Sequence, residues 1–477
     1  MPTPRFNAEP GLFIDGHWQA GEHLLEVIAP ATEAPLAAVA GATAADVERA
    51  VAAARRAFDG WATTAPGERA ACLRRIAQGL AEQREALLAL QCANNGKPRF
   101  EAELDVDDAI ATFEYYAGLA ASQADAEVPL PVEGFSARLR REACGVVGLI
   151  VPWNFPMVTT AWKLAPALAA GCTVLLKPSE VTPLAELAMA RIVAASGLPA
   201  GVFNVLCGTG QAVGAAMAAH PGIAKISFTG SNAVGVRVMQ SAAHTVKGVS
   251  LELGGKSALL VLEDADLDQA VTLAAGGGFF NAGQMCSATS RVLVAAPLYE
   301  AFLARLVAAA EAMQAGTDIG PLVNATQYQR VLAHVRQGQA AGAVVRCGGG
   351  RPAHLRQGYF IAPTVFTEVP LASALWREEI FGPVLCVRPF ADLDEAVRLA
   401  NDTEYGLVAS VVGGDDAVLE AVANRLRAGT VWLNSPQAIF PQTAWGGYKQ
   451  SSLGRELGPW GLAAFQEVKH VVKAGLG

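Results

Sequence analysis

Short apolar runs alternate with longer, alanine-rich amphipathic segments along most of the chain after residue 143. Five runs come first (VVGLIV, TVLLK, FNVLC, KISFTG and VSLEL), and after residue 257 the pattern resumes with ALLVL, RVLVA, LCVRPF, VASVV and TVWLN. Apolar strands separated by helices are typical of a parallel sheet that is covered on both faces. The pattern therefore predicts an α/β fold with two such units, the first of the dinucleotide-binding type. Helices of the second unit are expected at 297–315, 325–341, 392–401 and 415–427.

The part of the chain before residue 143 has a different pattern. Short strands and turns are expected over residues 11–40, and three helices follow, at 43–58, 69–94 and 100–121. Glu101, Asp105 and Asp108 lie four and three residues apart in the third helix, so they share one face, which is expected to face solvent. Segment 122–142 is polar and interrupted by prolines, and it is predicted to extend away from the first domain.

Composition narrows the class of protein. The chain has 477 residues, of which 52% are hydrophobic and 17% charged, as expected for a globular protein of two or three domains. The net charge of −8 and the absence of a basic run argue against nucleic acid as a partner. The uncharged stretch 143–162 is long enough to span a bilayer, but Pro152, Asn154 and Pro156 interrupt it, so no membrane partner is expected either.

The eight cysteines are dispersed without a CxxC pair, and the seven histidines form no HExxH motif. This distribution suits a reducing compartment and offers no framework for zinc, so no metal is expected. The N-terminal residues lack a basic segment followed by an apolar core, and no signal peptide is expected. Together these features lead us to expect a cytoplasmic protein.

Residues 276–291, GGGFFNAGQMCSATSR, carry the strongest chemical signal. Four glycines, at 276, 277, 278 and 283, allow the backbone to approach a ligand closely, and a predicted strand follows. Cys286 in such a loop is a candidate nucleophile, because a thiolate is intrinsically reactive once its pKa is lowered. The alternative is a buried cysteine that acts as a small hydrophobe, as most cysteines do.

Two glycine-containing turns are candidates for a pyrophosphate site. The run 208–214 is GxGxxxG, one residue away from the usual dinucleotide spacing, and is a weak match. Gly230 and Ser231 are better placed, because they follow a predicted strand and precede a predicted helix whose first N–H groups are free to bind an anion.

Four more motifs stand next to predicted strands: 152–156 (PWNFP), 177–180 (KPSE), 252–256 (ELGGK) and 379–383 (EIFGP). The first three follow strands of the first unit. Ligands of open α/β sheets bind beyond the carboxyl ends of the strands, so these three motifs are expected to converge on one crevice. Each motif taken singly is more simply explained as an ordinary turn.

Taken together and in this order, PWNFP, KPSE, FTGS, ELGGK, GQMCS, EEIFGP, NDTEYGL and GGYKQSSLGRE resemble the NAD(P)-dependent aldehyde dehydrogenase superfamily over nearly the whole chain. NNGKP, FEYYAGLA, GYFIAPT and WGGYKQS are similar to its betaine-aldehyde and aminoaldehyde dehydrogenase branch. The resemblance implies a Rossmann-type NAD-binding domain (1–121 and 143–252), a second α/β catalytic domain (253–440) and small oligomerisation elements (122–142 and 455–477). It also implies a homodimer or a dimer of dimers.

The resemblance implies five catalytic residues. Cys286 is implied as the nucleophile, Glu252 as the general base, and Asn154 as an oxyanion donor together with the backbone N–H of Cys286. Lys163 and Glu456 match positions of a proton relay. The chemistry is consistent, because hydride can leave a thiolate adduct of an aldehyde, and a buried carboxylate with a raised pKa can activate water against the resulting thioester.

For the cofactor the resemblance implies NAD, with NADP less favoured. A carboxylate at Glu180 would accept hydrogen bonds from ribose hydroxyls and repel a 2′-phosphate. The implied cofactor-binding residues are Val151, Trp153, Lys177, Ser179, Glu180, Gly230, Ser231, Leu253, Glu379 and Phe381.

The substrate is expected to be a small aldehyde. The positions that match the branch's box of aromatic rings are Phe155, Trp162, Phe280 and Trp445. Aromatic faces attract a cation by roughly 0.5–2 kcal/mol each, which favours a betaine-aldehyde or ω-aminoaldehyde substrate. Asp105 and Asp108 are expected to add a negative mouth. The alternative is an apolar tunnel for neutral aldehydes, because Phe155 replaces the tyrosine that is usual in cation-handling relatives.

Three other functions are compatible with parts of this pattern. A CoA-acylating relative is disfavoured by the presence of Glu252, and a catalytically silent binding protein by Cys286, Glu252 and Asn154 together. A cysteine hydrolase without a cofactor is disfavoured because no histidine lies in any of the motifs. Two departures from the family pattern, a shortened connection at 310–321 and Ser452 in place of the usual glycine, are not expected to touch a chemical residue.

Overall fold

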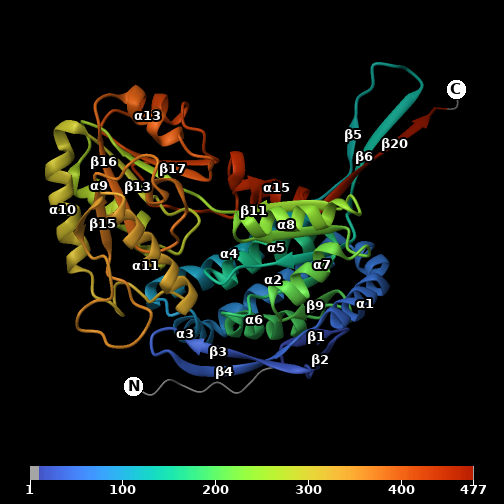
Figure 1. The fold of residues 1–477 in the computed structure, drawn as a ribbon. Helices are drawn as coiled ribbons and strands as arrows, with labels where there is room; N and C mark the ends of the chain where they lie inside the picture. Colours follow the sequence, from blue (N-terminus) through green and yellow to red (C-terminus); the bar gives the residue numbers. More distant parts are fainter. Residues whose placement is uncertain (1–9, 476–477) are drawn as a thin grey trace.

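The computed structural model describes residues 10–475, so the ends of the predicted ranges 1–121 and 455–477 lie partly outside the described residues. Two mainly parallel sheets form separate α/β units, and a three-stranded sheet projects as an arm from one of them (Figure 1). Both units expected from the hydrophobic pattern are therefore present, and the predicted α/β fold class is confirmed.

The first unit contains a sheet of eight strands in the order β19-β11-β10-β7-β8-β9-β1-β2. Five of its strands, β11, β10, β7, β8 and β9, are parallel. The antiparallel strand β19 closes one side, and the hairpin of β1 and β2 closes the other, with β1 antiparallel to β9. Every residue of β7 and β8 is buried, as their continuous apolar sequences predict. The strands are β1 (Leu12–Ile14), β2 (His17–Gln19), β7 (Val146–Ile150), β8 (Thr173–Lys177), β9 (Phe203–Leu206), β10 (Lys225–Thr229), β11 (Gly248–Glu252) and β19 (Ser452–Leu453).

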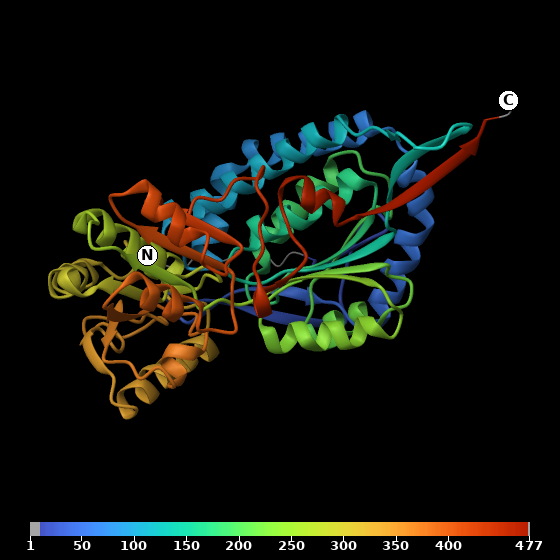
Figure 2. The same cartoon turned by 90° about the horizontal axis from the view of Figure 1, so that it is seen from above.

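Helices cover both faces of this sheet (Figure 2). The predicted helix over 69–94 is wrong in one respect, because it is two helices, α2 (Pro66–Glu82) and α3 (Arg84–Asn94), that meet at Gln83. The other helices are α1 (Ala44–Ala62), α4 (Arg99–Ala121), α5 (Pro156–Ala170), α6 (Pro183–Ala195), a π-helical turn (Gly210–Gly214), α7 (Ala215–Ala219) and α8 (Asn232–Ala243). A hairpin of β3 (His23–Ala29) and β4 (Ala34–Gly41) lies beside them.

The expectation that the acidic face of α4 is solvated is wrong. Glu101 and Asp105 are fully buried, and Asp108 is half-buried. The reason is that α4 packs against both α2 and α5, so this face points into the protein. Glu101 accepts from the N–H of Asn281 at 2.7 Å, and Asp105 accepts from the N–H of Val158 at 2.8 Å.

The second unit contains seven strands in the order β14-β15-β16-β13-β12-β17-β18, all parallel except β14. The strands are β12 (Ala258–Val261), β13 (Arg291–Ala295), β14 (Val344–Cys347), β15 (Thr364–Thr367), β16 (Val384–Phe390), β17 (Val408–Val412) and β18 (Thr430–Leu433). The main helices are α9 (Leu267–Phe279), α10 (Tyr299–Ala312), α11 (Ala325–Ala340), α12 (Ala374–Arg377), α13 (Leu393–Asn401) and α14 (Asp416–Ala423). Short 3₁₀ turns follow α9 and precede α10, at Phe280–Gly283 and Ala296–Leu298.

The arm is built from segments that are far apart in sequence. β6 (Phe135–Ala143) pairs with β5 (Ala126–Val128) on one side and along its whole length with the C-terminal strand β20 (Gln466–Ala474) on the other. It projects from the end of the molecule that is opposite the second unit (Figures 1 and 2). The predicted excursion at 122–142 and the predicted C-terminal strand thus belong to one structure. Before β20 the chain forms a 3₁₀ turn (Lys449–Ser451) and α15 (Gly458–Ala463).

None of the helices within residues 10–475 is long and apolar enough to cross a membrane. The uncharged stretch 143–162 is divided between β7, the loop after it and the first turns of α5.

Candidate active site

The loop between β7 and α5 carries Trp153, Asn154 and Phe155 to the carboxyl end of the first sheet. Two asparagine side chains hold its backbone: Asn95 Nδ2 donates to the carbonyl of Trp153 at 2.7 Å, and Asn281 Nδ2 donates to the carbonyl of Asn154 at 3.1 Å. No role was expected for these asparagines, although Asn95 lies in the motif NNGKP and Asn281 in the loop before Cys286.

The loop that presents Cys286 begins where α9 ends. Asn281 and Ala282 both have left-handed backbone conformations, with φ of 52° and 53°, which are uncommon for residues other than glycine. Such strained positions cluster at functional sites when the surroundings hold them in place. Here the side chain of Gln284 does so, because it donates to the carbonyl of Asn281 at 3.0 Å and accepts from the N–H of Val323 at 2.9 Å.

Asn154 lies against this loop, since its Nδ2 donates to the carbonyl of Gln284 at 3.0 Å. An amide nitrogen carries two protons, so the second remains available for an oxyanion beside Cys286. The ELGGK turn also lies against the Cys286 loop. A Cβ added at Gly255 would be only 2.4 Å from the carbonyl oxygen of Cys286. The structure thus brings together three motifs that are far apart in the sequence.

Cys286 is half-buried. Burial of its surroundings raises the pKa of Cys286 to about 12, and the carboxylates of Glu379 and Glu252 add to this effect. The resting side chain is therefore a neutral thiol near pH 7, and it has to lose a proton before it can attack.

Glu252 is buried at the end of β11. Burial, with a smaller contribution from the neighbouring Glu456 carboxylate, raises the pKa of Glu252 well above its ordinary range. Its Oε2 accepts a hydrogen bond from Ser452 Oγ at 2.9 Å, whereas its Oε1 has no partner among the described residues. The expectation that Ser452 touches no chemical residue is therefore wrong, because β19 pairs with β11 and Ser452 lies directly opposite Glu252.

Lys163 and Glu456 form a buried ion pair between α5 and the segment after β19. Ser227 Oγ also donates to Glu456 Oε1, at 3.4 Å. The backbone of Glu456 exchanges two hydrogen bonds with Trp445, at 2.7 and 2.8 Å. The two residues of the predicted relay are thus in contact with each other, and Glu456 is also in contact with Trp445.

The four predicted substrate residues meet near Cys286. The Trp162 and Trp445 rings are 5.5 Å apart and tilted, and the Phe155 and Phe280 rings are 6.3 Å apart and nearly parallel. Phe155 and Cys286 pack against one apolar cluster that contains Trp162 and Trp445. The other members of that cluster and its margin were not expected from the sequence, and they are Val158, Leu407, Val408, Trp432, Ile439 and Leu457.

The expectation that Asp105 and Asp108 form a negatively charged entrance to the site is wrong. Asp105 is fully buried and forms an ion pair with Lys97 at 3.0 Å, and it also accepts from the N–H of Val158 at 2.8 Å. Asp108 is half-buried, and burial raises its pKa to about 7. Asp105 therefore neutralises an internal cation instead of facing incoming substrate.

The predicted adenosine-side residues lie together after β8. Lys177 Nζ donates to Glu180 Oε2 at 3.1 Å and to the carbonyl of Pro178, and Glu180 keeps about a third of its side chain exposed. Ser179 Oγ accepts from the N–H of Val181. Val151, at the end of the neighbouring strand, donates its N–H to the carbonyl of Lys177.

The predicted pyrophosphate and nicotinamide residues line the neighbouring strand ends. Ser231 is the N-cap of α8, whose first N–H groups lack helical acceptors, and Gly230 precedes it. Trp153 and Phe381 contact each other edge to face at 5.2 Å. Burial raises the pKa of Glu379 to about 7, and its Oε1 accepts from the N–H of Gly255 at 3.0 Å. Leu253 is buried beneath α8, where a Cβ at Gly235 would be 2.7 Å from it.

This set of groups fits a dinucleotide. A partly exposed carboxylate beside an ammonium suits ribose hydroxyls, helix N–H groups suit a pyrophosphate, and a pair of aromatic rings suits a planar ring system. No metal ion is needed to explain any of these groups.

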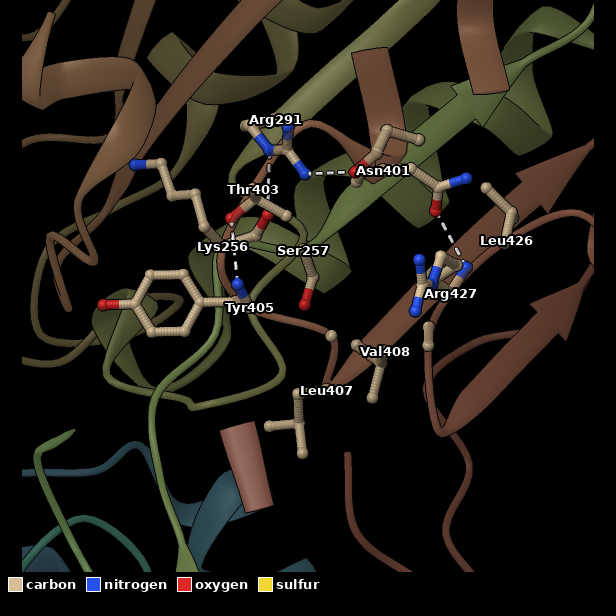
Figure 3. A pocket seen from close by; sticks show the side chains of 15 residues that line it. Lys256, Ser257, Arg291, Asn401, Thr403, Tyr405, Leu407, Val408, Leu426 and Arg427 are labelled. Carbon is tan, nitrogen blue, oxygen red and sulfur yellow. Dashed lines mark hydrogen bonds between the residues drawn. The ribbon is translucent and has the colours of Figure 1, made fainter. Parts of the chain in front are cut away.

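A small cavity of about 20 Å³ lies next to the ELGGK turn. It is lined by Lys256, the last residue of that turn, and by residues of the segment 400–409 (Figure 3). Arg291 crosses it and donates to the carbonyls of Leu399 and Ala400. A volume of this size holds about one water molecule, so this cavity is not a substrate site.

Two α/β units that present a cysteine, a buried carboxylate and a dinucleotide-type set of groups at strand ends define a dehydrogenase that acts through a thiol. The chain matches the Aldehyde dehydrogenase family over residues 18–471, and it belongs to this family. The expectation of an aldehyde dehydrogenase is therefore confirmed.

Several members of the family are similar to this chain over nearly its whole length. Betaine aldehyde dehydrogenase 1 of Oryza sativa is 45% identical, covering 99% of this chain and 97% of that protein. A chloroplastic aminoaldehyde dehydrogenase of Arabidopsis thaliana is 45% identical, covering 99% and 96%. A crystal structure of a betaine aldehyde dehydrogenase from Staphylococcus aureus, in complex with NAD+, has a TM-score of 0.97 at 37% identity, covering 98% of this chain and 95% of that chain.

The expectation of a cytoplasmic location is wrong. The Arabidopsis relative is named as chloroplastic, and a peroxisomal aminoaldehyde dehydrogenase of Malus domestica is 45% identical over 97% of this chain and 95% of that protein. A cysteine pattern that suits a reducing compartment does not by itself identify the cytoplasm.

Proposed function

We propose that this protein oxidises a small cationic aldehyde, of the betaine-aldehyde or ω-aminoaldehyde type, to its carboxylate with NAD. The observation that carries the proposal is the aromatic cluster against which Cys286 packs, formed by Trp162 and Trp445 with Phe155 at its margin. Relatives that are 45% identical over nearly the whole chain are named for these two classes of aldehyde, which supports the same substrate class here.

In the first half of the reaction, Cys286 Sγ loses its proton and attacks the aldehyde carbon. The oxygen of the adduct becomes negative, and the free N–H of the Asn154 amide and the backbone N–H of Cys286 stabilise it. NAD, held beside Trp153 and Phe381, would supply the acceptor for the hydride that leaves the carbon. What remains on Cys286 is a thioester, which the apolar cluster protects from bulk water.

In the second half, Glu252 takes a proton from a water molecule that attacks the thioester carbon. Its buried carboxylate has the raised pKa that a general base near neutral pH requires. Collapse of the adduct breaks the C–S bond and releases the product. Cys286 is left as a thiolate, which then accepts a proton. The Lys163–Glu456 pair lies close to Glu252 and provides a route by which the proton leaves.

A cationic substrate is favoured because two tryptophan rings and two phenylalanine rings surround the approach to the thiol. Each ring face that contacts a cation contributes roughly 0.5–2 kcal/mol. One observation favours the second candidate, a neutral aldehyde: the ammonium of Lys97 already lies over Phe155, at 3.9 Å from the ring centre, so one face of that ring is occupied.

Matched pairs of aldehydes test the proposal. Betaine aldehyde and 3,3-dimethylbutanal have the same shape and differ in charge, and 3-aminopropanal and butanal form a second pair. We expect kcat/KM for NADH formation to be higher for the cation of each pair, and to fall toward the neutral value in Trp445→Leu. Equal efficiencies within both pairs, unaffected by Trp445→Leu, would establish the neutral candidate.

The predicted domain boundaries and the homodimer or dimer of dimers belong to the same proposal. The arm supports an oligomer, because β6 and β20 leave large apolar side chains such as Phe135, Val468 and Val472 exposed. A second copy of the chain, pairing its own arm or covering this face, would remove these side chains from water.

A further inference from the structure

Ser452 stands at a position where the family resemblance implies a glycine, and its hydroxyl contacts Glu252, the residue proposed as the general base. It lies in β19, directly opposite Glu252 of β11 in an antiparallel pair. Residues directly opposite each other in such a pair carry their side chains on the same face of the sheet. A side chain at this position therefore meets the Glu252 side chain, which a glycine could not do.

The two hydrogen bonds of Ser452 show that its hydroxyl is the donor in the contact with Glu252. Ser452 Oγ accepts from the N–H of Gly447 at 2.6 Å and lies 2.9 Å from Glu252 Oε2. A backbone N–H only donates, so the hydroxyl is the acceptor in the first contact. Its single proton is then directed at Glu252 Oε2. The hydroxyl is thus held by the backbone of the turn at Gly447.

The other oxygen of the carboxylate is in a different situation. Glu252 Oε1 is buried and has no hydrogen-bond partner among the described residues. It faces the turn at Gly446, where a Cβ would be 2.8 Å away. An unsatisfied, buried carboxylate oxygen is costly, and a water molecule is the natural partner for it.

We infer that Ser452 is a positioning residue, which holds the Glu252 carboxylate by Oε2 and leaves Oε1 as the atom that takes the proton from the attacking water. This inference rests on the proposed role of Glu252 as the general base. In the step, the O–H bond of water breaks, its proton goes to Oε1, and the oxygen forms a bond to the thioester carbon while the C–S bond to Cys286 breaks.

The other groups that act on Glu252 define what removal of the hydroxyl changes. Glu456 opposes the negative charge of Glu252, whereas Lys163 and Arg455 favour it, and the Cys286 thiol lies on the remaining side. The hydrogen bond from Ser452 lowers the pKa of Glu252 against the larger effect of burial. Its removal therefore raises this pKa further, and the base becomes protonated at a higher pH.

The test compares Ser452→Gly and Ser452→Ala with Ser452→Thr, which keeps the hydroxyl. The backbone at Ser452 is extended, with φ of −156° and ψ of 155°, which all three replacements adopt without strain. Ser435→Ala, which removes an exposed hydroxyl bonded only to the adjacent residue, is the control for loss of a serine. The aldehyde substrate is mixed rapidly with enzyme and NAD at a series of pH values. The NADH burst reports thioester formation, and the decay of acyl-enzyme mass after acid quenching reports its hydrolysis.

We expect unchanged burst rates in all variants. In Ser452→Gly and Ser452→Ala, acyl-enzyme decay slows by about tenfold near pH 7 and its acidic limb moves up by about one pH unit, as loss of a hydrogen bond to a charged group predicts. Ser452→Thr restores both values. The inference would be overturned if the acidic limb of acyl-enzyme decay in Ser452→Gly and Ser452→Ala stayed at its wild-type pH. It would also be overturned if the rates of the NADH burst and of acyl-enzyme decay fell equally and the acidic limb did not shift.

Glu252→Gln separates this inference from the proposed function. If Glu252→Gln gives a burst and then stalls while Ser452→Gly behaves as wild type, only the role of Ser452 is overturned. If Glu252→Gln keeps the wild-type rate of acyl-enzyme decay, Glu252 is not the base, and both the proposed deacylation step and the inference fall.

Discussion

The ammonium nitrogen of Lys97 lies 3.9 Å from the centre of the Phe155 ring and 3.0 Å from Asp105 Oδ2. Both ends of the ion pair are fully buried. The other oxygen of Asp105 accepts from the N–H of Val158 in the first turn of α5, and Gln91 donates to Asp105 from α3. The pair therefore joins α3, α4 and α5 directly behind a ring that lines the substrate approach.

Removal of one member of this pair is expected to destabilise the protein strongly. Lys97→Met would leave the Asp105 carboxylate buried without a counterion, at a cost of about 3–5 kcal/mol. We expect a Tm lower by several degrees in calorimetry. The double variant Lys97→Met/Asp105→Asn should recover a large part of the loss, because the remaining amide can still accept from Val158. A wild-type Tm in Lys97→Met would contradict a structural role for the pair.

The raised pKa of Cys286 predicts a steep pH dependence of its reactivity. Because the pKa is about 12, the thiolate fraction rises about tenfold for each pH unit between 7 and 10. Alkylation of Cys286 by iodoacetamide in the free enzyme should rise in the same way, as measured by mass spectrometry of its peptide. Cys286→Ala should lose this signal and all NADH formation, yet still bind NAD. A rate that levels off below pH 8 would show a thiol that is already activated.

Glu180 is expected to set the preference for NAD over NADP. Its partly exposed carboxylate is bonded to Lys177, and we propose that it accepts hydrogen bonds from a ribose hydroxyl and repels a 2′-phosphate. Glu180→Gln should raise the ratio of kcat/KM for NADP to that for NAD by about tenfold, or about 1.4 kcal/mol. Glu404→Gln, a change of another exposed glutamate, is the control. Equal use of both cofactors by the wild-type enzyme would refute the preference itself.

The exposed apolar face of β20 is expected to contribute to assembly. Val468 and Val472 alternate with Lys469 and Lys473 along the strand, so the two pairs point to opposite faces. Val468→Asp/Val472→Asp should shift the protein toward monomer in light scattering with chromatography, whereas Lys469→Ala/Lys473→Ala should leave the mass unchanged. A monomeric wild-type chain would exclude the proposed oligomer, and an unchanged mass in the aspartate variant would exclude this face.

Some site residues could be predicted because local sequence carries their signal. Gly230 and Ser231 follow an apolar strand and open a helix, which is visible in the sequence alone. Cys286 stands in a glycine-rich loop before a strand. The order of the surrounding motifs indicated which other residues accompany it in the family. The two α/β units followed from the alternation of short, continuous apolar runs with longer amphipathic segments, since a strand buried on both faces is apolar throughout whereas a covering helix is apolar on one face.

The burial of Glu101 and Asp105 could not be predicted from their spacing. Spacing shows that residues share a helical face, but it does not show what covers that face. In the structure α5 and the loop before Cys286 cover it, since Val158 donates to Asp105 and the N–H of Asn281 donates to Glu101. Lys97, which comes before the helix begins, supplies the charge that makes burial of Asp105 tolerable.

From the sequence alone came the chemistry: a carboxylate and an amide in motifs that end strands, a thiol in a glycine-rich loop, and aromatic rings nearby. Tertiary structure alone decided their partners. Ser452 meets Glu252 across 200 residues because β19 joins the edge of the first sheet in one particular register, and Lys163 meets Glu456 across 293. Side chains on neighbouring strands and helices meet only after the whole chain is packed, so register and packing, which no local pattern encodes, determine which groups share a proton or a charge.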